Sequence, residues 1–155
     1  MLKKYFGILC LTFVLALTAI APASAASEPQ SRKNSTNTKF VFDFDILGKA
    51  NTLGRPKQDA SGTYVMAYTM CGGGFDVYVD GYDATTGRWV DCTDKAKGQP
   101  HLRTVNQGRL ISQWVYERGY RTARLGGHRW LSDSPVTGVW SPDSSGNYPY
   151  LTPNT

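Results

Sequence analysis

Short runs of alternating apolar and polar residues recur from residue 39 onward, and they limit the possible folds more than any other feature of the sequence. In the first run, residues 39–46, one face carries Phe40, Phe42, Phe44 and Ile46. A period of two residues is typical of a β-strand with one buried and one wetter face. Glycine- and proline-containing turns separate the runs, and no long amphipathic helix is indicated between them. The pattern predicts an all-β domain of about eight short strands, arranged as an antiparallel β-sandwich or an open barrel.

The other expected strands follow from the same alternation or from clusters of β-branched and aromatic residues. They are residues 63–70, 75–80, 88–92, 101–105, 109–117, 122–127 and 135–140. Residues 109–117 fit two patterns, because Leu110 and Trp114 share a face in a helix as well as in a strand. The grouping of Trp114, Val115 and Tyr116 favours the strand. Residues 47–62 contain three glycines and a proline and are expected to form a loop.

The N-terminus has the three-part pattern of a secretory signal peptide. Lys3 and Lys4 precede an almost wholly apolar run, which ends in the small residues Ala23-Ser24-Ala25. This run is shorter than the roughly 18–20 apolar residues that a spanning helix needs. We therefore expect cleavage after Ala25, removal of residues 1–25, and a mature chain without a membrane span that is extracellular or associated with the cell wall.

The mature chain has the length of one domain. Residues 26–38 are polar and have no large apolar residue to anchor them, so a flexible leader is expected. Residues 39–146 contain the expected strands and should form the β-sandwich domain. Residues 147–155 include two prolines and are expected to form an extended tail.

Two cysteines, Cys71 and Cys92, remain after the signal peptide is removed with Cys10. In an exported chain such a pair is expected to form a disulfide. It would close a ring of 22 residues, which on the loop-entropy model is worth about 3 kcal/mol. A metal pair and two free thiols are the alternatives. The nearest histidine, His101, lies nine residues beyond Cys92 and no CxxC motif occurs, so no zinc site is predicted.

The positive charge is concentrated in one part of the chain. Residues 101–130 carry six arginines against the single acidic residue Glu117. Guanidinium groups suit phosphate and carboxylate partners, although arginines that alternate outward from strands also serve solubility alone. The candidate ligand-binding residues are Arg118, Arg121, Arg124, Arg129 and Trp130. The expected partner is an anionic cell-wall polymer or another surface protein, whereas export and the small net charge disfavour nucleic acid.

The residue types needed for catalysis are sparse. His101 and His128 are the two histidines, and neither HExxH nor GxSxG occurs. Asp43 and Asp45 alternate outward on the first expected strand, as solvated strand residues do. Asp76, Asp80 and Asp83 have oxygen ligands for calcium, but their spacing fits no EF-hand loop. We therefore predict no enzyme activity, no catalytic residues, no metal site and no cofactor.

Three C-terminal segments carry a resemblance to a known family. They are VNQG at residues 105–108, VYERGYRTARLGGHR at residues 115–129 and VTGVWSPDSSG at residues 136–146. These segments resemble a family of small exported proteins of Gram-positive bacteria that is catalogued as a domain of unknown function. The resemblance covers residues 39–146 and implies a secreted, β-rich domain, without an activity or catalytic residues to transfer. The cysteine pair is not part of that family's pattern.

Three functions are consistent with these observations. The leading one is a secreted or cell-surface β-sandwich module that binds a ligand, such as an anionic wall polymer. The second is a secreted antibacterial or toxin-like protein that acts on competing cells. The third is a secreted hydrolase with a carboxylate or histidine centre, for which a cleft containing two of the histidines and aspartates would be required.

Overall fold

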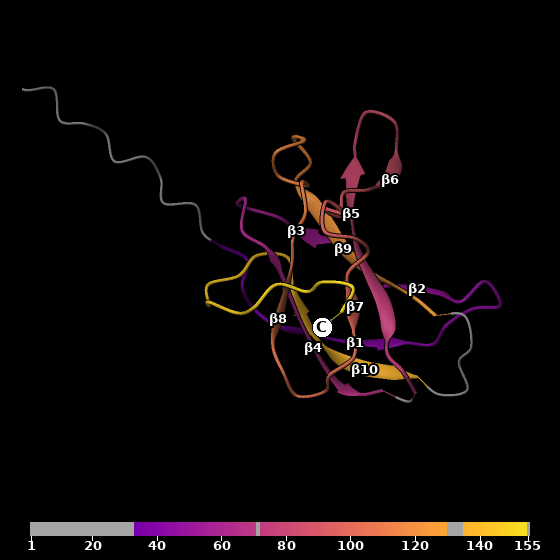
Figure 1. Cartoon of the computed structure of the whole chain (residues 1–155). Helices are drawn as coiled ribbons and strands as arrows, with labels where there is room; N and C mark the ends of the chain where they lie inside the picture. The colour runs from indigo at the N-terminus through magenta and orange to yellow at the C-terminus, as the bar shows by residue number, and fades with distance from the viewer. Residues whose placement is uncertain (1–32, 71, 130–134, 155) are drawn as a thin grey trace, which may run out of the picture. The chain divides into compact units, whose positions relative to one another are not determined.

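A computed structural model describes residues 33–70, 72–129 and 135–154, which belong to one compact unit. The described residues form ten β-strands and no helix (Figure 1). The strands are β1 (Thr38–Phe42), β2 (Lys49–Asn51), β3 (Arg55–Pro56), β4 (Thr63–Thr69), β5 (Phe75–Asp83), β6 (Arg88–Asp91), β7 (His101–Leu102), β8 (Arg109–Ile111), β9 (Thr122–His128) and β10 (Val136–Ser141). No helix in this part of the chain is long and apolar enough to cross a membrane.

The strands pair into two antiparallel sheets. One has four strands in the order β1-β10-β4-β8, and the other has the central order β2-β9-β5-β6. The short strands β3 and β7 extend the second sheet by pairing with β9 and β5. The chain crosses repeatedly between the two sheets, so strands that are distant in sequence lie side by side (Figure 1). The predicted all-β class and its antiparallel pairing are confirmed.

The main core joins side chains from both sheets. Phe40 and Phe42 of β1 are almost fully buried, and their rings lie 4.6 Å apart. Phe75 meets Phe42 edge to face at 6.0 Å. Trp140 of β10 belongs to the same cluster and is 1% exposed. A second, smaller cluster is built from Tyr64, Leu110 and Val139 of the four-stranded sheet. The alternation of apolar residues thus identifies most of the core.

Several expected boundaries differ from the structure. The first strand ends at Phe42, and Ile46 is fully exposed because Asp45 forms a turn. The Asp45 Oδ1 atom accepts the N–H groups of Leu47 and Lys49, both at 2.9 Å. Residues 47–62 contain two strands that were expected to be loop, β2 and β3. Residues 109–117 form a strand only as far as Ile111, and a turn follows over residues 115–119.

The described parts of the two segments expected to flank the domain contact it. Asn34, in the expected leader, donates its N–H to Asp143 at 2.8 Å and its side-chain amide to Pro56 at 2.8 Å. Leu151, in the expected tail, is buried, and its N–H donates to Leu110 at 2.8 Å. These bonds were not visible in the sequence, because each joins residues that are distant along the chain. The expected signal peptide, residues 1–25, lies outside the described residues.

Candidate functional site

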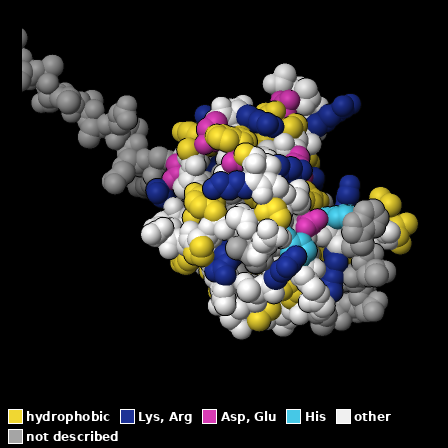
Figure 2. All heavy atoms as spheres, in the orientation of Figure 1, with side chains coloured by type: hydrophobic (Ala, Val, Ile, Leu, Met, Phe, Trp, Pro, Cys, Tyr) yellow, Lys and Arg dark blue, Asp and Glu magenta, His cyan; other side chains and the backbone are white. Residues whose placement is uncertain are grey.

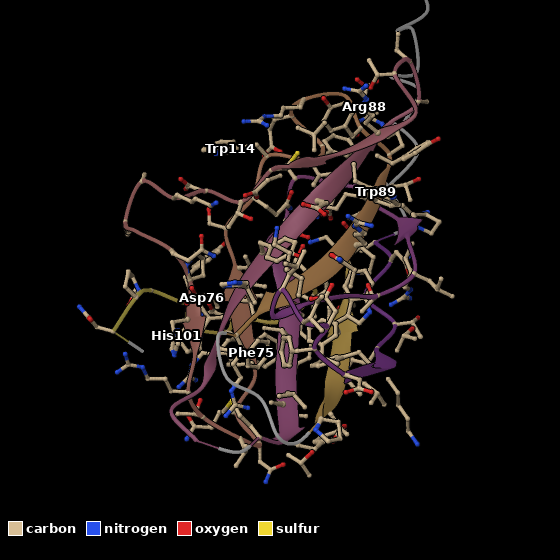
Figure 3. The ribbon with its side chains drawn as sticks, turned by 90° about the vertical axis from the view of Figure 1, so that its right-hand side faces the viewer. Phe75, Asp76, Arg88, Trp89, His101 and Trp114 are labelled. Atoms are coloured by element: carbon tan, nitrogen blue, oxygen red, sulfur yellow. The ribbon has the colours of Figure 1, made fainter. Side chains whose placement is uncertain are left out.

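The outer face of the six-stranded sheet carries polar and aromatic side chains in three rows that cross the strands. This face points away from the core, because the inward residues of β5 and β9 are Phe75, Val77, Val79, Ala123 and Leu125. The alternate residues of the same strands therefore point outward. Figure 3 looks onto this side of the molecule, with Asp76 and His101 beside each other and Trp89 farther along the sheet.

The middle row consists of Tyr78, Gly126 and Asn51. Gly126 lies opposite both other residues in the strand register. A Cβ atom at Gly126 would overlap the Tyr78 ring, so the missing side chain allows the ring to lie across β9. The Tyr78 hydroxyl donates to Asn51 Oδ1 at 3.1 Å. The ring is therefore held flat over the sheet between the other two rows.

The row on one side of the Tyr78 row consists of Asp91, Asp80 and Arg124. Asp80 lies opposite both of the other residues in the strand register. The Nε and Nη2 atoms of Arg124 contact Asp80 Oδ2 at 2.9 and 2.8 Å, and its guanidinium lies 4.5 Å from the centre of the Trp89 ring. Asp91 accepts a bond from Lys95 at 2.6 Å. Each acidic group in this row is thus paired with a cation.

The row on the other side of the Tyr78 row consists of His101, Asp76, His128 and Lys49. Each residue lies opposite the next in the strand register. His101 Nδ1 lies 2.6 Å from Asp76 Oδ1, and its Nε2 lies 3.0 Å from the carbonyl oxygen of Gly73. Both ring nitrogens of His101 are therefore engaged. In Figure 2 the two histidines, coloured cyan, lie on either side of an acidic group.

These rows line a cleft of about 520 Å³. Its lining residues are Lys49, Asn51, Asp76, Tyr78, Asp80, Trp89, Asp91, Lys95, Gln99, Arg124 and His128. Three carboxylates face three Lys and Arg side chains, so the lining has no formal net charge with His128 neutral. Among the described residues, no group of three or more His, Cys, Asp or Glu side chains is placed to hold a metal ion. The cleft offers many hydrogen-bond donors and acceptors beside aromatic rings.

Asp80 is the most buried acidic group of the cleft. Burial raises the pKa of Asp80 above its ordinary value of 3.8, and Asp91 acts in the same direction, although the bond from Arg124 opposes them. The neighbouring Asp91 behaves differently: its burial acts to raise its pKa, but the bonds from Lys95 and Thr93 outweigh burial and lower it. The pKa of Asp80 is therefore raised and that of Asp91 is lowered, although the two residues lie opposite each other in the sheet.

An Asp80→Asn variant is expected to gain stability relative to the wild type as the pH rises from 3.8. Because the folded-state pKa of Asp80 is raised, the folded protein binds more protons than the unfolded chain just above pH 3.8. The wild type therefore loses stability through that window, and asparagine removes this loss. Urea unfolding of both proteins at several pH values from 3 to 7 measures the difference. A difference that is constant with pH would contradict the expectation.

The structure describes four of the five predicted ligand-binding residues and places them at different sites. Arg124 lines the cleft, whereas Arg118 and Arg121 line a separate hollow beside the β5–β6 turn. The guanidinium of Arg121 bonds the carbonyl oxygens of Tyr116 and Tyr120 and lies 4.2 Å from the Tyr116 ring centre. Arg118 bonds the carbonyl oxygen of Asp91 at 3.1 Å.

Of the last two predicted residues, only Arg129 is described, and it lies at the end of β9. Arg129 follows β9, and its N–H donates to the carbonyl oxygen of Gly48 at 2.7 Å. Trp130 lies outside the described residues. The four described arginines thus lie in turns and in one strand, and Arg124 is paired with Asp80. Their role in binding an anionic ligand stays a prediction.

The predicted disulfide is not seen among the described residues. Cys92 is a free, buried cysteine, and its partner in the prediction, Cys71, lies outside them. The Cys92 Sγ atom donates to the carbonyl oxygen of Val90 at 3.3 Å and lies 3.8 Å from Arg118. Burial raises the pKa of the Cys92 thiol, so it is held in the unreactive protonated form. The pairing with Cys71 stays a prediction.

Sequence reasoning missed the cleft as a unit, although part of its signal was present. Asp76 and Asp80 were considered as calcium ligands, and their alternation with Val77 and Val79 indicates an outward face. The sequence did not indicate that Lys49 and Asn51 line the cleft, because these residues lie in a segment that was expected to be a loop. Gly126 was visible only as a glycine within a strand, which is a sign of close approach by a neighbour.

A family model described as "Protein of unknown function (DUF2712)" matches residues 22–144. The match covers more than half of the chain, and the chain belongs to this family. The expected membership of a family of unknown function is thereby confirmed, while the export and the bacterial source implied by the resemblance stay predictions. No match was found among the curated proteins or among the solved structures.

Proposed function

We propose that this chain is an exported binding module and that its ligand is a hydroxyl-rich saccharide chain of a cell wall, which contacts the polar cleft of the six-stranded sheet. The observation that carries the proposal is the Tyr78 ring, held flat over Gly126 between two rows of charged side chains. A sugar presents one apolar face and a rim of hydroxyl groups. Aromatic rings suit the face, and fixed polar side chains suit the rim.

The charge of the cleft supports a neutral ligand over a polyanion. Asp76, Asp80 and Asp91 balance the nearby lysines and Arg124, so the cleft does not attract a strongly negative polymer. The ion pairs also fix the side chains before the ligand arrives, which lowers the entropy cost of binding. Arg118 and Arg121 lie outside the cleft and line a separate hollow. This hollow is a second candidate site, for an anionic polymer.

The pairing of the carboxylates also favours binding over hydrolysis. The cleft does contain His128 together with three aspartates, as the hydrolase hypothesis requires. However, Asp76 is bonded to His101, Asp80 to Arg124 and Asp91 to Lys95. A general base or a nucleophile needs a carboxylate aimed at the substrate. These three carboxylates are instead directed at neighbouring side chains of the protein.

The Tyr78→Ala variant is expected to lose retention on cell walls by about 30-fold, which corresponds to the roughly 2 kcal/mol cost of truncating a central aromatic contact. The purified mature protein is sedimented with bacterial walls before and after hydrofluoric acid removes their anionic polymers. Retention should persist on the stripped walls. Gly126→Ala should weaken binding in the same direction, because its methyl group displaces the Tyr78 ring.

Two controls separate the candidate sites. Tyr68→Ala removes a tyrosine that is 43% exposed on β4, in the other sheet, and should retain wild-type binding. The double variant Arg118→Ala, Arg121→Ala should also bind normally. Loss of retention in this double variant and on stripped walls, with Tyr78→Ala unaffected, would replace the cleft by the arginine site. Unchanged retention in all variants would remove both sites.

A further inference from the structure

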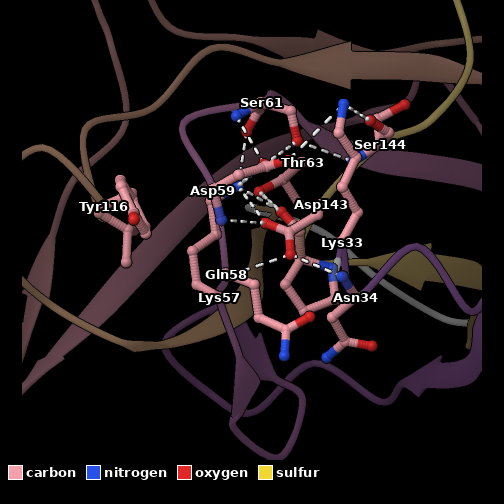
Figure 4. A network of polar contacts seen from close by, with 12 residues as sticks. Lys33, Asn34, Lys57, Gln58, Asp59, Ser61, Thr63, Tyr116, Asp143 and Ser144 are labelled. Atoms are coloured by element: carbon pink, nitrogen blue, oxygen red, sulfur yellow. Dashed lines mark hydrogen bonds and ion pairs between the residues drawn. The ribbon is translucent and has the colours of Figure 1, made fainter. Parts of the chain in front are cut away.

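A lysine and an aspartate from distant parts of the chain meet in complete burial. Lys57 follows β3 and Asp143 follows β10, and both side chains have 0% exposure to solvent. The Nζ atom of Lys57 lies 2.7 Å from Asp143 Oδ1. Figure 4 shows the two side chains within a dense group of polar contacts. Water is excluded from this amine and this carboxyl group.

The second oxygen of Asp143 occupies a pocket of backbone donors. Its Oδ2 atom accepts the N–H groups of Asn34 at 2.8 Å and Gln58 at 3.0 Å. Two fixed N–H groups aimed at one oxygen are the arrangement that stabilises the oxyanion of an acyl-transfer intermediate. The same two donors also satisfy the second oxygen of the buried carboxylate before any reaction.

A second carboxylate, Asp59, lies beside the amine. Asp59 Oδ1 is 3.9 Å from the Nζ atom of Lys57 and accepts bonds from the N–H and hydroxyl groups of Ser61. Burial acts to raise the pKa of Asp59, but the bonds from Ser61 and the charge of Lys57 outweigh it and lower the pKa. Asp59 is therefore ionised, and its position 3.9 Å from the amine makes it the carboxylate available to take a proton from Nζ.

We propose that Lys57 and Asp143 condense into an intramolecular amide, with release of one water molecule. A proton first moves from the Lys57 ammonium to Asp143 Oδ1, which gives a neutral amine and a neutral acid. The Nζ lone pair then forms a bond to Asp143 Cγ, and the Oδ2 oxyanion is held by the two N–H groups. Asp59 takes a proton from Nζ and passes it to Oδ1, which leaves as water while Oδ2 regains its double bond.

The surroundings fit the reactants and the product. Burial lowers the pKa of Lys57, although its bond to Asp143 opposes this, and a neutral amine is the nucleophile that the reaction needs. The ammonium now donates to the carbonyl oxygens of Ser61 and Pro142. The amide has a single N–H, but these two carbonyls also accept from Gln113 at 2.9 Å and from Thr63 at 3.1 Å. Neither oxygen is left without a donor after condensation.

Mass spectrometry of the denatured, purified protein tests the proposal. The amide lowers the mass by the 18 Da of one water and blocks trypsin at Lys57. The digest should therefore contain a branched product in which residues 50–88 are joined to residues 130–155. An intact mass equal to that calculated for the purified residues without loss of water, with cleavage after Lys57, would overturn the proposal. A loss of 18 Da in a linear peptide would also overturn it, since it would indicate a succinimide.

Two comparisons separate this chemistry from proximity alone. Lys95 and Asp91 are equally close, at 2.6 Å, but their side chains are 48% and 43% exposed, so their peptides should stay linear in the same digest. Asp59→Asn keeps both reacting groups and removes the proton acceptor. This variant should be at least tenfold less cross-linked at equal times after folding. A fully cross-linked Asp59→Asn protein would remove Asp59 from the mechanism. A peptide of residues 89–97 that is 18 Da lighter and uncleaved after Lys95 would show an Asp91–Lys95 ring, and burial would then not be required.

Discussion

Asp143→Ala is expected to lower the free energy of unfolding by about 3–5 kcal/mol, the usual cost of breaking a buried ion pair by removing one partner. The variant leaves the ammonium of Lys57 in a site with no exposure to solvent. It also removes the acceptor for the N–H groups of Asn34 and Gln58. Such a loss is a large part of the about 5–15 kcal/mol that stabilises a typical domain. If the amide has formed, its removal adds to the loss.

Urea unfolding of the wild type and the variant measures this effect. The matched control is Asp43→Ala, which changes an exposed aspartate next to the end of β1. The control should change stability by no more than about 0.5 kcal/mol, as is usual for surface substitutions. A loss of less than about 1 kcal/mol in Asp143→Ala would mean that water reaches Lys57, and the burial of the pair would then be wrong.

The strands could be predicted because their signal is local. Alternating side chains mark β5, and aromatic and β-branched residues mark β4. The turn between β5 and β6 contains Gly87 at a φ of +68°. The same rule failed at Ile46, where the alternation continues but Asp45 ends the strand with hydrogen bonds to the backbone. Side-chain period reports which face a residue would occupy in a strand. It does not report whether the strand continues.

The buried pair could not be predicted from the sequence. Lys57 lies in a segment rich in glycine and polar residues, and Asp143 lies in the turn-like run Ser141-Pro142-Asp143-Ser144-Ser145-Gly146. Polar composition favours solvent exposure, and a buried lysine is rare unless it is paired. The pair forms because the loops after β3 and β10 meet, and that meeting depends on the order of strands in both sheets.

The cleft is an intermediate case. The outward residues of β5 follow from its alternation, so Asp76, Tyr78 and Asp80 are predictable as one row along the strand. Their partners come from β9 and β2, which pair with β5 and β9 respectively. Strand order is not encoded in any local pattern. The arginines were predicted to form one site because they are close together in the sequence. In the fold, Arg124 lines the cleft, whereas Arg118 and Arg121 line a separate hollow.

The four-stranded sheet contains a position where even one methyl group is too large. Gly138 of β10 lies between β1 and β4, next to an irregularity in the pairing of β10 with β4. A Cβ atom there would overlap the backbone carbonyl oxygen of Met66 and lie 2.7 Å from the Phe40 ring. The ring has neighbours on all sides in the core, and a backbone oxygen has no rotamer through which to move away.

Gly138→Ala is therefore expected to lower the free energy of unfolding by about 3 kcal/mol, the upper end of the usual cost of overpacking a core. The control is Gly73→Ala, where a Cβ atom has no neighbour within 4 Å and the backbone is not in the left-handed region. Thermal and urea unfolding of both variants should show a loss in Gly138→Ala alone. Equal stability of the two variants would mean that β10 can separate from β4 at Met66, and the register of the central strands would then be wrong.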